Sequence, residues 1–158
     1  LLLYRTLELI MQMRLGEYAI NVSHPDYSKL PKAKSLREYE DEYSRKWNST
    51  HGNKNNRFKT NRNLPSPLSM MGGYVLLATL KDSIIGKNSN SFLNQLLELN
   101  KLRNNSVFAH GFNSITEREY NRYYSFVEDR VNEFCIIKNI EVTNEVDKIT
   151  FIKTYDID

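Results

Sequence analysis

The chain alternates between segments whose apolar residues recur every three or four positions and segments rich in turn-forming residues. Residues 1–20 have this apolar spacing, which predicts an amphipathic helix. Residues 35–47 predict a second helix, because Ser35 and Glu38 are placed as a capping box at its start. The apolar stripe of this second helix consists of Leu36, Tyr39, Tyr43 and Trp47.

Two further helices are predicted in the centre of the chain. Residues 69–85 form a compact apolar segment, which predicts the most buried helix, and a turn beginning near Gly86 ends it. Its paired glycines permit close contact with another helix. Residues 91–110 predict the next helix, and Gly111 is placed where a left-handed C-terminal cap is usual.

The last predicted helix begins at a second capping box, formed by Thr116 and Glu119, and runs to about residue 137. Its predicted core stripe is Tyr120, Tyr123, Tyr124, Val127, Val131 and Phe134. The remaining residues change period, and Ile149 to Ile152 favour a short strand. The pattern therefore predicts a mostly all-α protein, a helical bundle with a small irregular or short β extension at its C-terminus.

The length of 158 residues fits one domain with a hydrophobic core. The amphipathic pattern is already established at residue 1, so we expect a fragment of a longer protein that lacks an N-terminal partner domain. A single cysteine, Cys135, excludes an internal disulfide framework. Because no apolar run approaches the roughly 18 residues of a membrane span and no signal peptide precedes the first helix, we expect a soluble, cytoplasmic protein.

The net charge of +3 is small, but the charges are unevenly distributed. No Asp or Glu occurs from Ser44 to Lys81, and residues 48–67 predict a long basic loop within that window. An anionic partner would prefer this region. Its candidate RNA-binding residues are Arg45, Lys54, Arg57, Lys59 and Arg62. When the charge distribution is considered alone, it favours the alternative interpretation, an ordinary solvated loop.

The sequence contains no Gly-rich phosphate loop, no HExxH motif and no paired cysteines, so it predicts no metal site and no cofactor. Only three histidines are present. His24 lies in a Ser-His-Pro-Asp connector, which favours a turn residue. His51 follows the second helix in an Asn-rich stretch, where we expect it to be solvated.

Arg103 and His110 are the candidates for chemistry. They are seven residues apart, so a helix would place them about 20 degrees apart on one face. That face continues the apolar stripe of Leu96 and Leu99, where a cation or an imidazole requires compensation. Histidine moves protons near neutral pH, and a guanidinium stabilises charge on phosphoryl oxygens. Uncharged hydrogen-bonding groups follow at Asn104, Asn105 and Ser106.

Two interpretations of this pair stay open. Acid–base chemistry on a phosphodiester is one, and hydrogen bonding of both side chains to helix carbonyls is the other. The physics of the chain alone favours the structural interpretation. The spacing itself has little weight, because Arg45 and His51 are also an Arg followed by a His, with five residues between them. We expect the chain to leave the helix by Asn48, so this second pair would not share a face.

The stretch LRNNSVFAHG, residues 102–111, resembles the signature of HEPN-domain ribonucleases. In that signature an Arg, usually followed by a polar residue, precedes a His with four to six residues between them; here six intervene and Asn104 is the polar residue. The opening LYRTLELIMQMRLGEYAIN is similar to the start of the HEPN region in CRISPR-associated CARF-HEPN proteins of type III systems.

This resemblance implies an all-helical domain that forms a homodimer with one composite active site, to which each subunit brings Arg103 and His110. The implied activity is metal-independent cleavage of single-stranded RNA, in which the 2'-hydroxyl attacks the adjacent phosphorus. In that scheme His110 handles the proton or orients the hydroxyl, Arg103 steadies the phosphate and Asn104 positions one of them. Regulation by cyclic oligoadenylate would act only through the missing N-terminal CARF domain.

Two other functions remain alternatives. One is a non-catalytic helical module of the same fold that dimerises or binds nucleotides or RNA, in which Arg103 and His110 serve the structure. The other is the toxin of a toxin–antitoxin pair, which would use the same chemistry. The tyrosines at 120, 123 and 124 could stack RNA bases, although their helical spacing favours the core.

Overall fold

The protein was analysed as a computed structural model that describes residues 2–31, 34–51, 63–105 and 115–140. Within these ranges it is helical, and no strand occurs in them, so the predicted all-α fold class is confirmed. The predicted strand at residues 149–152 lies outside the described residues. Among the described helices, none combines the length and the apolar character that a bilayer crossing requires.

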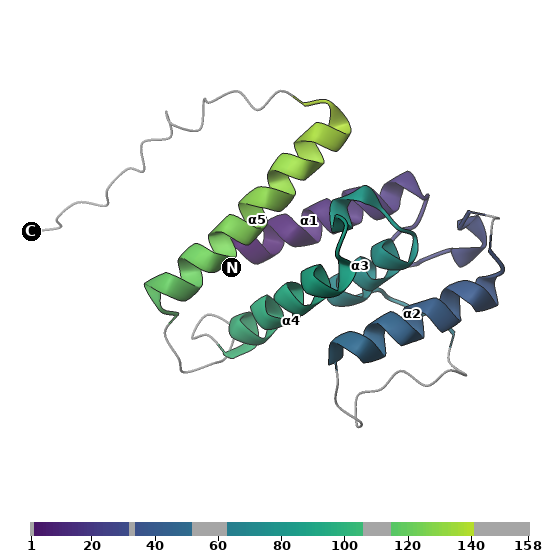
Figure 1. The fold of residues 1–158 in the computed structure, drawn as a ribbon. Coiled ribbons are helices and arrows are strands. Elements are labelled where there is room, and N and C mark those ends of the chain that lie inside the picture. Colours follow the sequence, from purple (N-terminus) through teal and green to yellow (C-terminus); the bar gives the residue numbers. More distant parts are fainter. Residues whose placement is uncertain (1, 32–33, 52–62, 106–114, 141–158) are drawn as a thin grey trace, which may run out of the picture.

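The bundle is built around α3 (Met70–Thr79), in which all ten residues are buried. The helices α1 (Leu2–Glu17), α2 (Leu36–His51) and α4 (Ser89–Asn105) all pack against it, and α5 (Glu117–Lys138) packs mainly on α1. Figure 1 shows α5 crossing the other helices at an angle. Two short 3-10 helices, η1 (Tyr27–Lys29) and η3 (Ser83–Ile85), lie in the connectors.

The predicted helix starts are confirmed at both capping boxes. The Ser35 hydroxyl accepts from the Glu38 amide at 3.3 Å, and the Glu38 carboxylate accepts from the Ser35 amide at 2.6 Å. Thr116 and Glu119 form the same reciprocal pair ahead of α5. At its other end α5 stops at Asn139, which adopts the left-handed conformation that ends many helices.

α1 and α3 approach closely at Gly73. A Cβ atom added there would lie 2.3 Å from the Met11 sulfur, so any larger residue would force the Met11 side chain to shift. The Tyr74 hydroxyl, also on α3, donates to the Leu7 carbonyl of α1 at 2.8 Å. The predicted close helix contact at the paired glycines is therefore confirmed.

Several predicted boundaries and core positions are wrong. α2 continues to His51, whose ring stacks on Trp47 one turn earlier, so that the last turn of the helix is packed. The buried helix in the centre ends at Thr79 instead of near Gly86. Leu36 is 47% exposed and is not a core residue.

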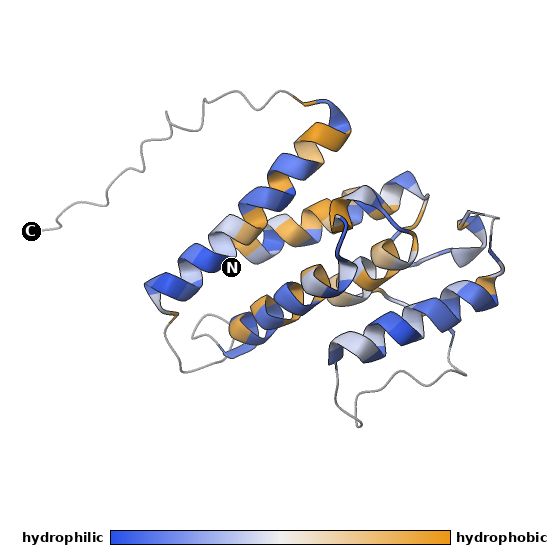
Figure 2. Cartoon of the chain, viewed as in Figure 1, coloured by the Kyte–Doolittle hydropathy of each residue, from blue (hydrophilic) through white to orange (hydrophobic). Residues whose placement is uncertain are grey.

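The faces of α5 also differ from the prediction. Tyr123, Val127 and Phe134 are buried as predicted, and Val131 packs partly buried against the core. Tyr120 and Tyr124 are 50% and 45% exposed, whereas Phe126, which was not predicted, is buried. The buried face of α5 is centred on Tyr123, and Tyr120 and Tyr124 lie beyond the edge of this face. Figure 2 shows the resulting alternation of apolar and hydrophilic residues around α5.

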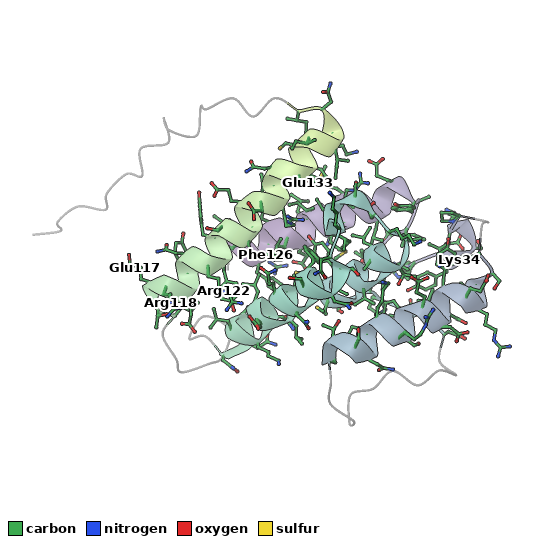
Figure 3. The ribbon with its side chains drawn as sticks, in the orientation of Figure 1. Lys34, Glu117, Arg118, Arg122, Phe126 and Glu133 are labelled. Carbon is green, nitrogen blue, oxygen red and sulfur yellow. The ribbon has the colours of Figure 1, made fainter. Side chains whose placement is uncertain are left out.

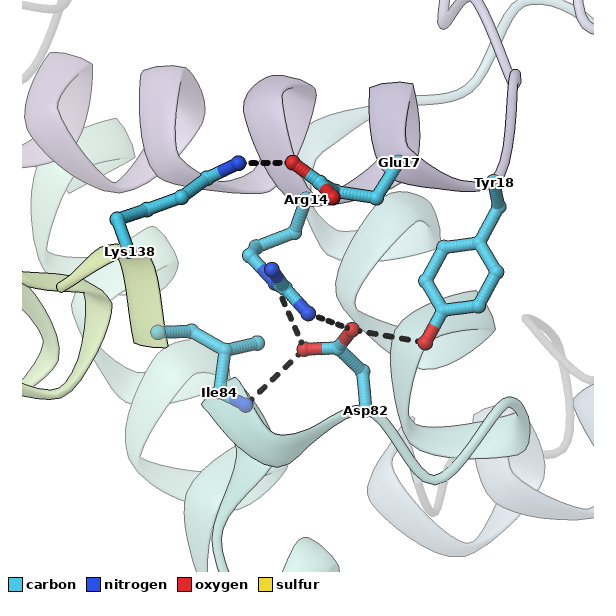
Figure 4. Close-up of polar contacts among 6 residues, drawn as sticks. All are labelled: Arg14, Glu17, Tyr18, Asp82, Ile84 and Lys138. Atoms are coloured by element: carbon cyan, nitrogen blue, oxygen red, sulfur yellow. Dashed lines mark hydrogen bonds and ion pairs between the residues drawn. The ribbon is translucent and has the colours of Figure 1, made fainter. Parts of the chain in front are cut away.

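A buried ion pair joins α1 to the turn after α3. Arg14 donates to both carboxylate oxygens of Asp82, from Nε at 3.1 Å and from Nη2 at 2.7 Å (Figure 4). The same carboxylate accepts from the Tyr18 hydroxyl at 2.9 Å and from the Ile84 amide at 3.0 Å. The Asp82 side chain is fully buried and that of Arg14 is 10% exposed.

The environment shifts the pKa of both donor side chains. The hydrogen bond to Asp82 raises the pKa of Arg14, so this guanidinium stays charged. Burial, followed by the hydrogen bond to Asp82, raises the pKa of Tyr18 to about 12, so its hydroxyl stays a donor at neutral pH. The carboxylate therefore has four donors for its two oxygens, which satisfies a buried charge.

We predict that Asp82→Ala lowers the free energy of unfolding by about 3–5 kcal/mol, because it leaves the Arg14 guanidinium buried without its anion. Urea denaturation of the purified chain measures this. The matched control is Glu17→Gln, which breaks the exposed pair between Glu17 and Lys138 and should leave the unfolding midpoint nearly unchanged. Equal shifts in the two variants would contradict a special role for the buried pair.

Candidate active site

Arg103 lies in the last turn of α4, at the end of a buried stripe that includes Leu96 and Leu99. Its side chain is half-buried and its Nε atom is buried. The Nη1 atom donates to the Asn104 Oδ1 atom at 3.2 Å. Structure and sequence agree that this cation sits at the edge of the core, and the neighbouring Asn is one of the groups that compensate its burial.

Tyr4 provides the second contact of Arg103. The guanidinium carbon of Arg103 lies 4.4 Å from the centre of the Tyr4 ring, within the range of a cation–π interaction. The Tyr4 hydroxyl donates to the Asn100 Oδ1 atom at 3.3 Å, one turn before Arg103 on α4. Burial raises the pKa of Tyr4, and the charge of Arg103 partly opposes this shift. The ring is thus neutral at physiological pH.

No sequence pattern indicates the contact between Tyr4 and Arg103. Tyr4 belongs to the first turn of the amphipathic α1, where an aromatic residue is most simply explained as part of the core. Nothing in the spacing relates it to a residue 99 positions later. Only the packing of α1 beside the end of α4 brings the two side chains together.

Some of the predicted site residues lie outside the described part of the chain. Asn104 and Asn105 are exposed at the end of α4, and Arg45 is exposed on α2. The shared face of Arg103 and His110 stays a prediction, since α4 is described only to Asn105. The predicted residues outside the described ranges are His110, Ser106, Lys54, Arg57, Lys59 and Arg62.

α5 is tied to the Arg103 end of α4 by a salt bridge. The Arg122 Nη2 atom lies 2.5 Å from the Glu98 carboxylate, and both side chains are about half exposed. Figure 3 shows Arg122 on the side of α5 that faces α4. Since Glu98 precedes Arg103 by five residues, roughly 7.5 Å along the helix, the N-terminal half of α5 runs close to the candidate site.

His51 is not the solvated loop residue that we expected. It ends α2, half-buried, and its ring stacks on Trp47 with the ring centres 3.9 Å apart. Its Nδ1 atom is 3.0 Å from the Trp47 carbonyl oxygen. Burial lowers the pKa of His51, the hydrogen bond to the Trp47 carbonyl partly opposes this shift, and the nearby Lys101 acts in the same direction as burial. His51 is therefore neutral at physiological pH, and its contacts with Trp47 stabilise the C-terminal end of α2.

In the part of the chain that the structure describes, no cluster of three or more His, Cys, Asp or Glu side chains is placed to hold a metal ion. A surface hollow is lined by Gln12, Gly16 and residues 19–23, at the C-terminal end of α1. It is far along α1 from Tyr4, and it brings together no titratable side chains, so we do not assign the chemistry to it.

A comparison with known protein families shows which family the chain belongs to. A family model described as the Csm6 HEPN domain matches residues 1–134, which include all of α1 to α4 and the LRNNSVFAHG segment. The chain belongs to the Csm6 HEPN domain family. No curated protein and no solved structure matches it significantly.

Membership of this family confirms the predicted relationship to CRISPR-associated HEPN domains. The family is one of CRISPR-associated HEPN nucleases. The two stretches that resemble HEPN proteins, at residues 3–21 and 102–111, both fall within the matched region. The role of Arg103 stays a prediction.

We predict that His51 titrates below pH 6.5 and that the domain loses stability on acidification. Because burial lowers its pKa in the folded state, the unfolded chain binds the proton more readily. The free energy of unfolding should therefore fall as the pH drops from about 6.5 through the folded-state pKa. Proton NMR of the imidazole, and the fluorescence of Trp47, the single tryptophan, follow this titration.

The control for this titration is the exposed His24. His24→Gln should leave the pH-dependent change in Trp47 fluorescence intact, and His51→Gln should abolish it. A fluorescence change that survives His51→Gln would show that another group causes it.

Proposed function

We propose that this domain is an endoribonuclease that cleaves single-stranded RNA without a metal ion, in the cytoplasm and in CRISPR antiviral defence. The observation that carries the proposal is the half-buried Arg103, placed over Tyr4 and beside Asn104 within a segment that matches the Csm6 HEPN family. A guanidinium held in this way is suited to a phosphate, because it offers several N–H donors and a charge that does not titrate.

In the proposed reaction the 2'-hydroxyl of the RNA attacks the adjacent phosphorus, and the bond to the 5'-oxygen of the next nucleotide breaks. The products are a 2',3'-cyclic phosphate and a 5'-hydroxyl. The 2'-hydroxyl loses its proton and the departing 5'-oxygen gains one, and His110 either takes part in this proton transfer or orients the hydroxyl. Arg103 steadies the charge that develops on the phosphoryl oxygens, and Asn104 holds the Arg103 guanidinium by the hydrogen bond described above. Specificity for RNA over DNA follows from the need for the 2'-hydroxyl.

We further propose that two copies of the domain form a composite site, each contributing one Arg103 and one His110. The basic residues would guide the RNA backbone toward it. They are Arg45, Lys54, Arg57, Lys59 and Arg62, with Asn105 and Ser106 as nearby polar groups. Cyclic oligoadenylate would act on the site only through an N-terminal CARF domain.

A non-catalytic module is the second candidate. The observation that favours it is the same environment of Arg103, since a cation with an aromatic and an amide partner also stabilises the contact between α1 and α4. In this case Arg103→Ala would lower stability and change nothing in an RNA assay.

We predict that wild-type protein cleaves labelled single-stranded RNA in the presence of EDTA, and that His110→Ala and Arg103→Ala each lower the rate by about 10²- to 10⁴-fold. Gel analysis gives the rates, and mass spectrometry identifies the cyclic phosphate. The matched control is His51→Ala, which removes the histidine of the other Arg–His pair and should keep the wild-type rate. Retained cleavage in either the His110 or the Arg103 variant would contradict the assigned roles.

A further inference from the structure

The Tyr4 ring contacts the Arg103 guanidinium, and this contact involves no hydrogen bond from the guanidinium. The guanidinium carbon lies 4.4 Å from the centre of the ring, so the contact is with the face of the aromatic system. An arginine side chain has five N–H donors, and a cation–π contact occupies none of them. The ring therefore limits the movement of the cation without competing for its N–H groups, of which Nη1 donates to Asn104.

Tyr4 is itself held in place from two directions. Its hydroxyl donates to the Asn100 side chain on α4, the helix that carries Arg103. Its own helix, α1, is fixed to α3 by the hydrogen bond from Tyr74 to the Leu7 carbonyl, one turn away from Tyr4. Because both helices constrain the ring, its position does not depend on the Arg103 side chain.

We infer that Tyr4 is a positioning residue for the proposed reaction, which holds the Arg103 guanidinium where it meets the phosphate. This inference rests on the proposed function. A guanidinium already held in a partly desolvated place needs little reorganisation when charge develops on the phosphoryl oxygens. Without the ring, the long Arg103 side chain would sample other rotamers, and the fraction of molecules with a competent site would fall.

The test compares three substitutions in the full chain. Tyr4→Leu removes the ring and should lower kcat for single-stranded RNA by about 5- to 30-fold, the range expected for the loss of a partly desolvated cation–π contact. Tyr4→Phe keeps the ring and loses only the hydroxyl, so its kcat should stay within about threefold of wild type. Leu3→Ala, in the same turn of α1, removes apolar packing and leaves the ring in place.

Leu3→Ala controls for a loss of stability. Measured well below the unfolding temperature of every variant, it should keep the wild-type kcat even where its unfolding temperature falls as far as that of Tyr4→Leu. A second readout, independent of cleavage, is the NMR signal of the Arg103 side chain. The Tyr4 ring current should shift this signal in the wild type and in Tyr4→Phe, and the shift should be absent in Tyr4→Leu.

The outcomes separate this inference from the proposed function. Wild-type kcat in Tyr4→Leu, or an equal loss of kcat in Leu3→Ala, would overturn the positioning role and leave the ribonuclease intact. An Arg103 signal without a ring-current shift in the wild type would overturn the geometry on which the role depends. Failure of the wild type to cleave RNA would overturn the proposed function, and the positioning role would fall with it.

Discussion

The fold depends on the buried carboxylate of Asp82, which is the point where three helices meet. Arg14 of α1 donates to this carboxylate, and Asp82 itself lies in the turn between α3 and η3. Arg130 of α5 donates to the Ile84 carbonyl in the same turn at 2.9 Å. An anion buried this deeply is tolerated only with its four donors in place, so the relative position of these helices is constrained more tightly than apolar packing alone would require.

This constraint reaches the candidate site through α1. Arg14 and Tyr4 are ten residues apart, about 15 Å along a helix, and between them Leu7 and Met11 contact α3. A helix fixed at several points along its length behaves as a rigid element, and its first turn inherits the position set by the rest. Contacts that have no part in the proposed reaction therefore place the Tyr4 ring beside Arg103.

Periodicity predicted the helices because local signals determine them, and it failed where distant contacts decide. The capping boxes at Ser35 and Thr116 were found because their partners are three residues away. The pairs Arg14–Asp82 and Arg103–Tyr4 join residues far apart in the chain, so no local pattern reveals them. The faces of Tyr120 and Tyr124 were wrong for a related reason, since a stripe of apolar and aromatic residues can be wider than the surface that covers it. At the candidate site, the sequence motif pointed to Arg103 and Asn104 as candidates, and no local pattern pointed to the Tyr4 ring.

The structural and the functional interpretations of Arg103 do not exclude each other. Desolvating a guanidinium costs free energy, and a residue that served only to end α4 could avoid that cost by interacting with helix carbonyls at the surface. Here the Arg103 guanidinium lies over the face of the Tyr4 ring, and this contact does not involve hydrogen bonds from its N–H groups. That arrangement also contributes to the contact between α1 and α4, as a purely structural role would. It does favour a cation that keeps one orientation before a phosphate arrives, which is the property that transition-state stabilisation requires.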